Sequence, residues 1–201
     1  MSSNEICNDL QIQSLVVRER YYRDTCQWAK LRNCYHADSS KTRIQITWYQ
    51  GDIDGFVTGS ERMSAGGTAA VHTIYPVEIH VNGNKAFTES TGSISIRFQH
   101  EGCTYDCVSF TRFISRLEAV NGEWKLLTLD AIYDRDSIVP VVPNAPVEFH
   151  IPHDARQSYK CISWLLSQKG FDIRQDLPGT DDTTACQKLL EGSLEWLQKM
   201  D

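Results

Sequence analysis

The carboxylate of Asp24 lies where an amphipathic helix pattern calls for an apolar side chain. Residues 17–35 read VRERYYRDTCQWAKLRNCY, and at about 100° per residue one stripe of this segment would pack on a core. That stripe contains Val17, Tyr21, Asp24, Trp28, Leu31 and Tyr35. The opposite side, predicted to face solvent, contains Glu19, Arg23, Gln27 and Lys30. An isolated buried carboxylate costs several kcal/mol, so Asp24 needs a partner, a shifted pKa or contact with water.

A purely structural role for Asp24 is also open. The run Asp24-Thr25-Cys26-Gln27 fits a capping box, in which an acidic side chain caps a helix and a Gln three residues later reaches back. One helix would then end near Arg23 and another would begin at Thr25.

His72 and Arg112 are the candidate partners for this acid. Pro76 interrupts the strand that follows His72, so periodicity does not determine where the imidazole points, and a partly exposed structural histidine is the commoner case. In a later strand one face carries Val108, Phe110, Arg112 and Ile114. If that face is the core, Arg112 is a buried cation suited to pair with an acid. The alternative is an arginine at a sheet edge that reaches solvent.

The chain lacks the local motifs of several enzyme classes. There is no Gly-rich phosphate loop, no G-x-S-x-G, no H-E-x-x-H and no dinucleotide fingerprint. His150 and His153 flank a proline and have no third ligand nearby, so no metal site is predicted. The seven cysteines are odd in number and scattered, which indicates reduced thiols. We therefore expect neither a metal nor a cofactor.

One carboxylate, one imidazole, several phenols and an apolar wall remain. Such groups suit proton transfer on a hydrophobic molecule that bears a carbonyl, with a phenol or Arg112 polarising the carbonyl. The same groups would also serve a ligand-binding module without catalysis. The side chains expected to contact the bound molecule are Tyr21, Tyr22, Trp28, Trp48, Tyr49 and Phe110.

An antiparallel sheet is predicted to carry His72 and Arg112. Residues 42–49 alternate apolar and polar side chains, and from His72 onward two Asn-Gly pairs, at 82–83 and 121–122, predict hairpins between long strands. Gly92 is a candidate bulge or kink. Residues 52–59 are predicted to be a loop, and 60–70 a short glycine-interrupted helix or loop. Since helices precede the strands, the fold class is α+β, with helices on one face of a curved antiparallel sheet.

A second region follows the sheet. Residues 139–152 carry four prolines and are predicted to be an extended linker. Two helices are expected next, one ending at Gly170 and one over 183–200. Residues 1 to about 10 are expected to be frayed. We therefore divide the chain into a domain over 10–142 and a helical annex over 143–201, which would close the pocket mouth or build an oligomer interface.

Composition excludes some partners. The chain has 201 residues and a net charge of −6, and no basic stripe interleaves with aromatic residues, so nucleic acid is not expected to bind. No apolar run approaches the ~20 residues that span a bilayer, and the first residues do not form a signal peptide. We expect a cytoplasmic protein that assembles as a homo-oligomer, either a dimer or a trimer.

The order of several short motifs resembles a known family. The run D-T-C-Q-W from Asp24 resembles the D-x-x-D-W that ends the first helix of SnoaL-like polyketide cyclases and dehydratases, in the nuclear-transport-factor-2-like superfamily. His72 followed by I-H-V-N-G-N-K-A-F-T-E-S, and the later W-K-L and I-Y-D-R-D, resemble further parts of that family, over about residues 10–142. The resemblance implies a cone-shaped barrel in which a curved sheet and N-terminal helices enclose a deep pocket.

The scytalone dehydratase-like branch adds an expectation about chemistry. In that branch an Asp at the first helix and a His at the first long strand form an acid–base pair, which corresponds here to Asp24 and His72. Residues 94–96 lack the branch's second histidine, and Arg23 replaces a tyrosine. Members with a helical tail are frequent in fungal biosynthetic clusters, which implies a tailoring enzyme of fungal secondary metabolism.

The predicted function is that of a cofactor-independent lyase or isomerase. It would dehydrate, isomerise or cyclise a hydrophobic, carbonyl-bearing polyketide or similar natural-product intermediate. Asp24 would hold and charge His72, His72 would remove a proton alpha to the carbonyl, and Arg112 or a tyrosine would stabilise the enolate. One alternative is a non-catalytic ligand carrier or assembly subunit. Another is a dimerisation module whose pocket is filled by Trp28 and Trp48.

Overall fold

The computed structural model describes residues 2–143 and 148–199. Four residues of the predicted linker, 144–147, and the predicted last helical residue, Met200, lie outside these ranges. The helices are α1 (Ser3–Asp24), α2 (Trp28–Asn33), α3 (Ile53–Ala65), α4 (Lys160–Gln168) and α5 (Thr183–Gln198), with a short 3-10 helix at Ser39–Lys41. The strands are β1 (Arg43–Ile46), β2 (Tyr49–Gly51), β3 (Ala70–Asn82), β4 (Lys85–His100), β5 (Cys103–Val120), β6 (Glu123–Leu126) and β7 (Thr128–Pro140).

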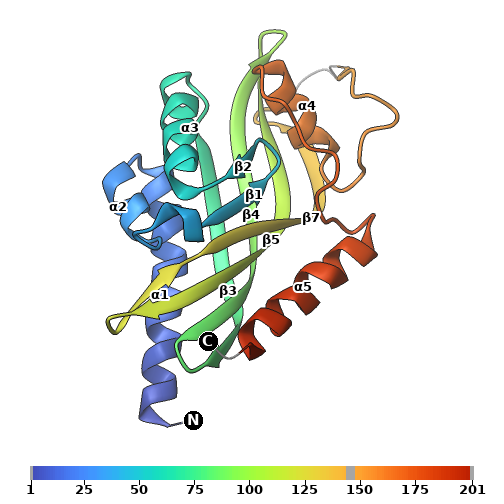
Figure 1. Ribbon diagram of the computed structural model, residues 1–201. Helices are drawn as coiled ribbons and strands as arrows, with labels where there is room; N and C mark the ends of the chain where they lie inside the picture. The colour runs from blue at the N-terminus through green and yellow to red at the C-terminus, as the bar shows by residue number, and fades with distance from the viewer. Residues whose placement is uncertain (1, 144–147, 200–201) are drawn as a thin grey trace.

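The strands form one curved, open sheet, which confirms the α+β fold class. Its order is β2-β1-β7-β5-β4-β3, and β6 pairs with the end of β5. All the pairs are antiparallel except β1 with β7, which is parallel. Figure 1 shows the long strands bending around the helices, with α1 to α3 on one side and α5 crossing the other.

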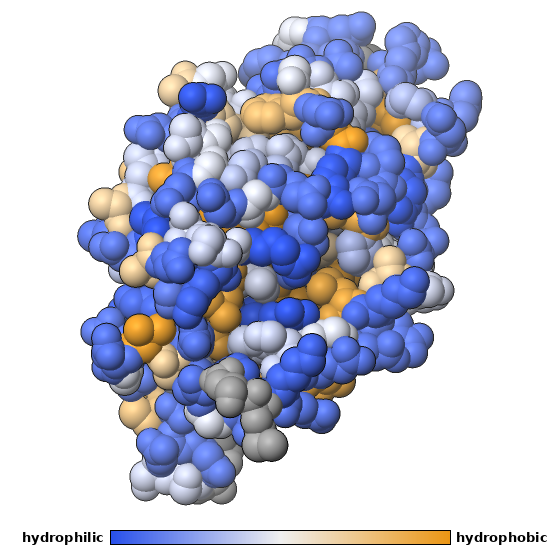
Figure 2. Space-filling model, in the orientation of Figure 1, coloured by the Kyte–Doolittle hydropathy of each residue, from blue (hydrophilic) through white to orange (hydrophobic). Residues whose placement is uncertain are grey.

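The main core lies between the sheet and the helices α1 to α4. Its buried side chains come from α1 (Ile12), α2 (Leu31), α3 (Phe56), the sheet and α4 (Leu166). A second, smaller apolar cluster lies on the outer face, where α5 covers Ile114 and its neighbours. On the side shown in Figure 2, hydrophilic side chains cover most of the surface. Within the described ranges, no helix is both long and apolar enough to cross a bilayer.

Local sequence accounts for both hairpins. Gly83 and the pair Asn121-Gly122 have positive φ angles, a conformation that asparagine and glycine adopt at little cost, so both predicted turns are confirmed. The strands shift register at Pro76 and at Phe110, whereas pairing continues unbroken through Gly92. The prediction of a bulge at Gly92 is therefore wrong. Glycine is needed there because a Cβ would lie 2.3 Å from the carbonyl oxygen of Thr73.

The helix α1 starts earlier and faces differently from the predicted pattern. It begins at Ser3, where Ser2 and Glu5 form a capping box, so the prediction of fraying is wrong for residues 2–10. Its buried face contains Ile12, Val16, Glu19, Arg20 and Arg23, whereas Val17 and Tyr21 are 40% and 58% exposed. The predicted stripe fails because Cys26, at φ 57°, breaks the segment and gives α2 a new phase.

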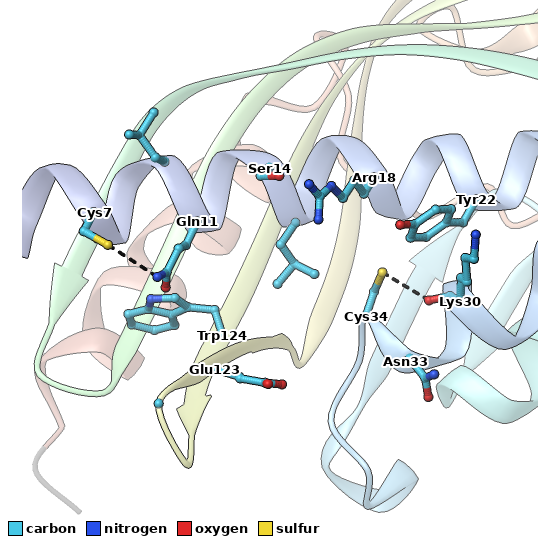
Figure 3. Close-up of a pocket in the computed structure, with 13 residues that line it drawn as sticks. Cys7, Gln11, Ser14, Arg18, Tyr22, Lys30, Asn33, Cys34, Glu123 and Trp124 are labelled. Carbon is cyan, nitrogen blue, oxygen red and sulfur yellow. Dashed lines mark hydrogen bonds between the residues drawn. The ribbon is translucent and has the colours of Figure 1, made fainter.

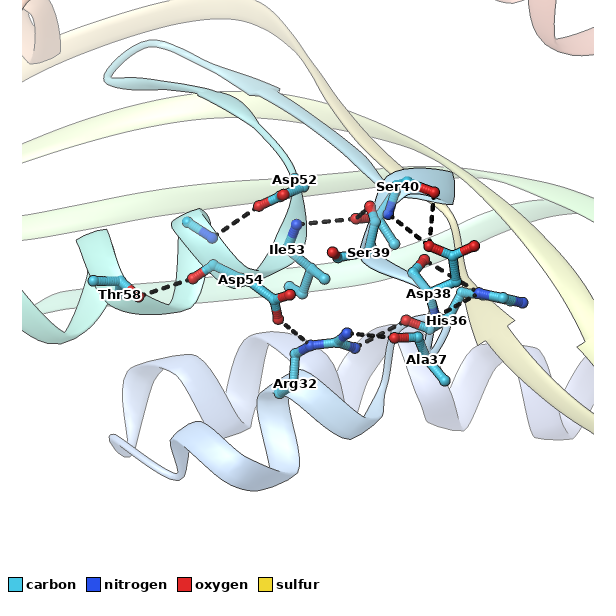
Figure 4. Close-up of polar contacts among 12 residues, drawn as sticks. Arg32, His36, Ala37, Asp38, Ser39, Ser40, Asp52, Ile53, Asp54 and Thr58 are labelled. Carbon is cyan, nitrogen blue, oxygen red and sulfur yellow. Dashed lines mark hydrogen bonds and ion pairs between the residues drawn. The ribbon is translucent and has the colours of Figure 1, made fainter.

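Residues 53–59, predicted to be a loop, form the first half of helix α3, and its second half lies in 60–70, where a short helix or loop was predicted. Asp52 caps it, since its side chain accepts a hydrogen bond from the N–H of Gly55. Arg32 of α2 holds α3 in place through an ion pair with Asp54, and it also donates to the carbonyls of residues 36 and 37 at 2.9 and 2.8 Å (Figure 4). The helices that cover the sheet are thus fastened to one another as well as to the core.

The C-terminal helices lie on opposite faces of the sheet. Helix α4 packs on β5 and β7 and buries Ile162 and Leu166 in the main core. It ends as predicted at Gly170, whose φ is +83° and whose N–H bonds back to Ser167. Helix α4 is therefore part of the wall of the main domain. The division of the chain at residue 142 stays a prediction.

Candidate active site

The side chains of Asp24 and His72 meet inside the fold. Asp24 is the last residue of α1 and His72 is the third residue of β3. The Asp24 carboxylate accepts two hydrogen bonds from one residue: the backbone N–H of His72 at 2.6 Å and its Nδ1–H at 2.7 Å. The helix-cap alternative is wrong, because α2 begins at Trp28 with Gln27 at its N-cap and no side-chain cap.

This arrangement fixes the tautomer of the imidazole. An ionised carboxylate only accepts hydrogen bonds, so Nδ1 of His72 carries the proton that it donates to Asp24. The second nitrogen, Nε2, is then left without a proton and can accept one. His72 lines an internal cavity.

Burial keeps the imidazole neutral. Desolvation is the largest cause that lowers the pKa of His72, to about 4, and the charges of Arg23 and Arg20 act in the same direction. The hydrogen bond to Asp24 acts against them and is outweighed. For Asp24, burial acts to raise the pKa, but the hydrogen bonds from His72 and the nearby Arg23 lower it overall. Asp24 therefore orients His72, whose imidazole is neutral at rest, and the prediction that Asp24 charges His72 during a reaction stays a prediction.

Two arginines that the sequence analysis did not select border the same cavity. Arg20 forms a two-pronged ion pair with Glu19, and the Tyr35 hydroxyl donates to Glu19 at 3.0 Å. Arg23 lies 3.6 Å from Asp24 and donates to the Met63 sulfur at 3.4 Å. Glu19 and Arg23, predicted to face solvent, are only 2% and 8% exposed. The spacing of Val16, Arg20 and Arg23 along one helical face was the available signal.

The charges of this group balance. Arg20 and Arg23 are cationic and Glu19 and Asp24 are anionic, so a protonated His72 would add an unpaired buried charge. Burial of an unpaired charge is costly, which is the physical reason that the imidazole stays neutral. A neutral imidazole beside a buried guanidinium can take a proton while the guanidinium receives developing negative charge.

The cavity itself is small and mostly apolar. Its open space is about 30 Å³, room for little more than a water molecule. The polar groups around it are His72, Arg20, Arg23, Thr47 and Tyr133, and the Tyr133 hydroxyl bonds to Thr47. The apolar lining comprises Ile46, Trp48, Met63, Ala70, Ile94, Ile96, Phe113, Ile162 and Leu166. Side chains of α1, α3, α4 and the sheet therefore surround the cavity that His72 borders.

Comparison with known proteins identifies the family. The model of the SnoaL-like domain matches residues 4–130, more than half of the chain. The chain belongs to the SnoaL-like domain family. Pea pathogenicity protein 2 of the fungus Fusarium vanettenii is 25% identical over 180 residues, which cover 85% of this chain and 74% of that protein.

Solved structures share the fold of this SnoaL-like chain. A putative scytalone dehydratase from Novosphingobium aromaticivorans superposes with a TM-score of 0.56 at 14% identity, covering 72% of this chain and 95% of that one. A hexachlorocyclohexane dehydrochlorinase from Novosphingobium barchaimii superposes with a TM-score of 0.55 at 15% identity, covering 72% and 97%. The predicted resemblance to the scytalone dehydratase-like branch is confirmed at the level of the fold.

Arg112, the predicted enolate stabiliser, lies on the outer face of the SnoaL-like sheet. Its guanidinium pairs with Asp134 at 3.1 Å and is 38% exposed, on the side covered by α5. Phe110 shares that face, is 40% exposed and lies under Arg135 at 4.8 Å. The alternation along β5 points Phe113 inward and Arg112 outward, so the structure separates Arg112 and Phe110 from His72.

The predicted aromatic contacts divide among different surfaces. Trp48 borders the cavity and stacks on Phe56 at 5.6 Å. Tyr49 lies in a recess outside it, and Tyr22 borders a separate groove along α1. Tyr21 is exposed, and Trp28 packs against the core from its rim. Of the six aromatic residues proposed from sequence, Trp48 alone is among those that border the cavity with His72.

Proposed function

We propose that this SnoaL-like protein is a cofactor-independent acid–base enzyme, a lyase or isomerase of the dehydratase, isomerase or cyclase type. The supporting observation is an imidazole that is bonded through Nδ1 to Asp24 and belongs to a residue lining an apolar cavity, which two arginines also border. Two structural neighbours carry the names of elimination enzymes, a dehydratase and a dehydrochlorinase. Each such elimination begins or ends with proton transfer.

In the proposed reaction His72 Nε2 removes a proton alpha to a carbonyl of the substrate. The imidazolium that forms is stabilised by Asp24, which is already bonded to Nδ1–H. Arg23 or Arg20, in place of Arg112, receives the charge of the enolate oxygen. The imidazolium then returns its proton, either to a leaving hydroxyl as water departs or to carbon in an isomerisation or ring closure.

The substrate we propose is a hydrophobic, carbonyl-bearing intermediate of a fungal secondary-metabolite pathway, such as a polyketide. The apolar lining favours a hydrophobic reacting end over a polar one. The fungal relative supports the source, and we place the enzyme in the cytoplasm as a dimer or trimer. These finer assignments rest on the family and on the chemistry of the cavity.

The proposal is tested by proton exchange at a carbon alpha to a ketone. Aromatic ketones such as tetralone, incubated with the enzyme in heavy water, are followed by NMR for loss of the alpha proton signal. His72→Ala and Asp24→Asn should each lower the exchange rate by at least tenfold, a modest part of the 10² to 10⁴ typical of general acid–base groups. Arg112→Ala, on the outer face, is the control and should leave the rate unchanged.

Wild-type exchange rates in a folded His72→Ala or Asp24→Asn variant would refute the proposal. Circular dichroism and thermal melting of each variant separate loss of chemistry from loss of fold.

A non-catalytic carrier is the second candidate. Ile94 and Ile96 occupy the region where the dehydratase branch has a second histidine, and both border the cavity. A carrier would bind the ketones equally well in wild type and in both variants, and no exchange would be detected in any of them.

A further inference from the structure

A second, larger recess lies directly outside the catalytic cavity. It is formed by α3, the turn that joins β1 to β2, and the residues after α4, and its open space is about 690 Å³. Trp48 and Met63 border both this recess and the cavity of His72, so these two side chains form the partition between them. The inner space of about 30 Å³ cannot hold a ring system, whereas the outer one falls within the range of small-molecule sites.

The charges that border the outer recess are all positive. Among the described residues that line it, the ionisable ones with a charge are Arg62, in the last turn of α3, and Lys169, which follows α4. Both are exposed, and neither has an ion-pair partner in the part of the chain that the structure describes. No Asp or Glu of the described ranges lines the recess.

Elsewhere in the chain several arginines have a carboxylate partner, although the net charge of −6 leaves many more carboxylates without one. Such pairs are Arg32–Asp54, Arg97–Asp106, Arg112–Asp134, Arg156–Asp181 and Arg174–Asp176. Two unpaired cations around one opening therefore attract an anion that the protein itself does not supply.

Aromatic side chains form the wall of the recess. Trp48 lies edge-on to Phe171 at 5.7 Å and is tilted against Tyr49 at 5.7 Å. Flat aromatic faces and edges of this kind pack well against a ring system. Gly59 makes room for the Trp48 ring, since a Cβ there would lie 2.9 Å from it. Met63, the second side chain of the partition, is unbranched and changes shape easily.

We propose that the outer recess is the anion-recognition part of the substrate site. The occupant is a small aromatic or polycyclic carbonyl compound that carries a carboxylate or similar anionic group at the end remote from the reacting carbonyl. Its rings pass the partition of Trp48 and Met63 toward His72, and its anionic end stays at Arg62 and Lys169. This inference rests on the proposed function for the identity of the reacting end.

Two fluorescent dyes with the same ring body test the charge requirement. Anilinonaphthalene sulfonate is anionic, and phenylnaphthylamine is its neutral counterpart. In Arg62→Gln/Lys169→Gln the sulfonate dye should bind roughly three- to tenfold more weakly, while the neutral dye binds within about twofold of wild type. Added salt should weaken sulfonate binding to the wild type, and this salt effect should largely disappear in the variant.

A groove on the far side of α1 provides a matched control. It has a similar open space, about 650 Å³. Trp124, two cations (Arg18 and Lys30) and one carboxylate (Glu123) border it, as Figure 3 shows. Arg18→Gln/Lys30→Gln removes the same charge from this groove and should not change the binding of either dye. If this control variant alone weakens the sulfonate dye, the dye binds along α1 and the inference is overturned.

Other results would also overturn it. Equal weakening of both dyes in Arg62→Gln/Lys169→Gln would show a change of shape without charge recognition, and unchanged binding would show that the two cations bind no anion. The variant His72→Ala separates catalysis from binding, because both dyes should bind to it as they bind to wild type. If exchange activity is absent while dye binding is as expected, the proposed function fails and the inference about the recess does not. If the enzyme is active but fails the dye test, the inference about the recess alone fails.

Discussion

The neutral state of His72 makes the stability of the protein depend on pH in a calculable way. In the folded protein the pKa of His72 is about 4, against 6.5 for an ordinary histidine. Between these values the unfolded chain binds a proton that the folded protein does not. Protons therefore favour unfolding as the pH falls from 6.5 to 4, and below about pH 4 both states are protonated and the difference stops growing.

The expected effect is large enough to measure. Each unit of pKa shift corresponds to about 1.4 kcal/mol, so the full loss is about 3 kcal/mol, of which about 2 kcal/mol is lost between pH 7 and pH 5. His72→Asn is the matched variant, because the Asn amide can still donate to Asp24 but does not titrate. Its stability should lack this component of the pH dependence.

Urea unfolding at pH 7, 6 and 5 provides the assay. The free energy of unfolding of wild type minus that of His72→Asn should fall by about 2 kcal/mol over this range. Asp130 and Asp136, whose pKa values are raised by burial, are present in both proteins, so their contributions cancel in this difference. A difference that stays constant from pH 7 to pH 5 would show that His72 titrates as an ordinary histidine and would refute the reasoning.

Three further predictions follow from the buried charges and the packing. The exchange rate per bound ketone should stay constant from pH 8 to about pH 5 and decline only near pH 4, where His72 becomes protonated; a decline centred on pH 6.5 would contradict this. Glu19→Ala should cost about 3–5 kcal/mol in urea unfolding because it leaves Arg20 buried without its partner, and a loss below about 1 kcal/mol would mean that the pair is solvated. Gly92→Ala should cost roughly 1–3 kcal/mol, because the new methyl would meet the carbonyl of Thr73, and an unchanged melting temperature would disprove that close approach.

Local signals in the sequence predicted the parts of the fold that depend on few residues. The Asn-Gly turns and the end of α4 at Gly170 need only a positive φ angle, which those residue types supply. Asp24 was selected because a carboxylate interrupted an apolar pattern. The resemblance to the family pointed to His72. Periodicity could not, because Pro76 interrupts the strand and leaves open which face of the sheet the His72 side chain is on.

The face of α1 was mispredicted because one helical phase was applied across a break. The left-handed residue Cys26 ends that phase, so Leu31 and Tyr35 are buried while Val17 and Tyr21 are not. In addition, adjacent residues of opposite charge neutralise each other in the core, as Arg20 does with its neighbour. A count of charged side chains cannot distinguish such a pair from two solvated ones.

The direction of Arg112 could not be read from alternation. Both faces of β5 carry apolar side chains, because the helices α1 to α4 cover one face and α5 covers part of the other. Phe113 on the inner face and Ile114 on the outer face are adjacent and both apolar, so the sequence does not show which of them faces the main core. The first half of α3 was predicted to be a loop for a different reason. Gly55 and Gly59 are typical of loops, but here each leaves room for an aromatic ring, of Tyr49 and Trp48 respectively.

The position of α4 has a consequence for how such a protein can diversify. The family match ends at residue 130, yet Ile162 and Leu166, well beyond it, border the cavity of His72. Under the proposed function, the residues that transfer the proton therefore lie within the family match, whereas part of the surface around the substrate lies outside it. Exchange of the C-terminal residues between SnoaL-like relatives is then expected to alter which molecule is accepted and to leave the proposed reaction unchanged.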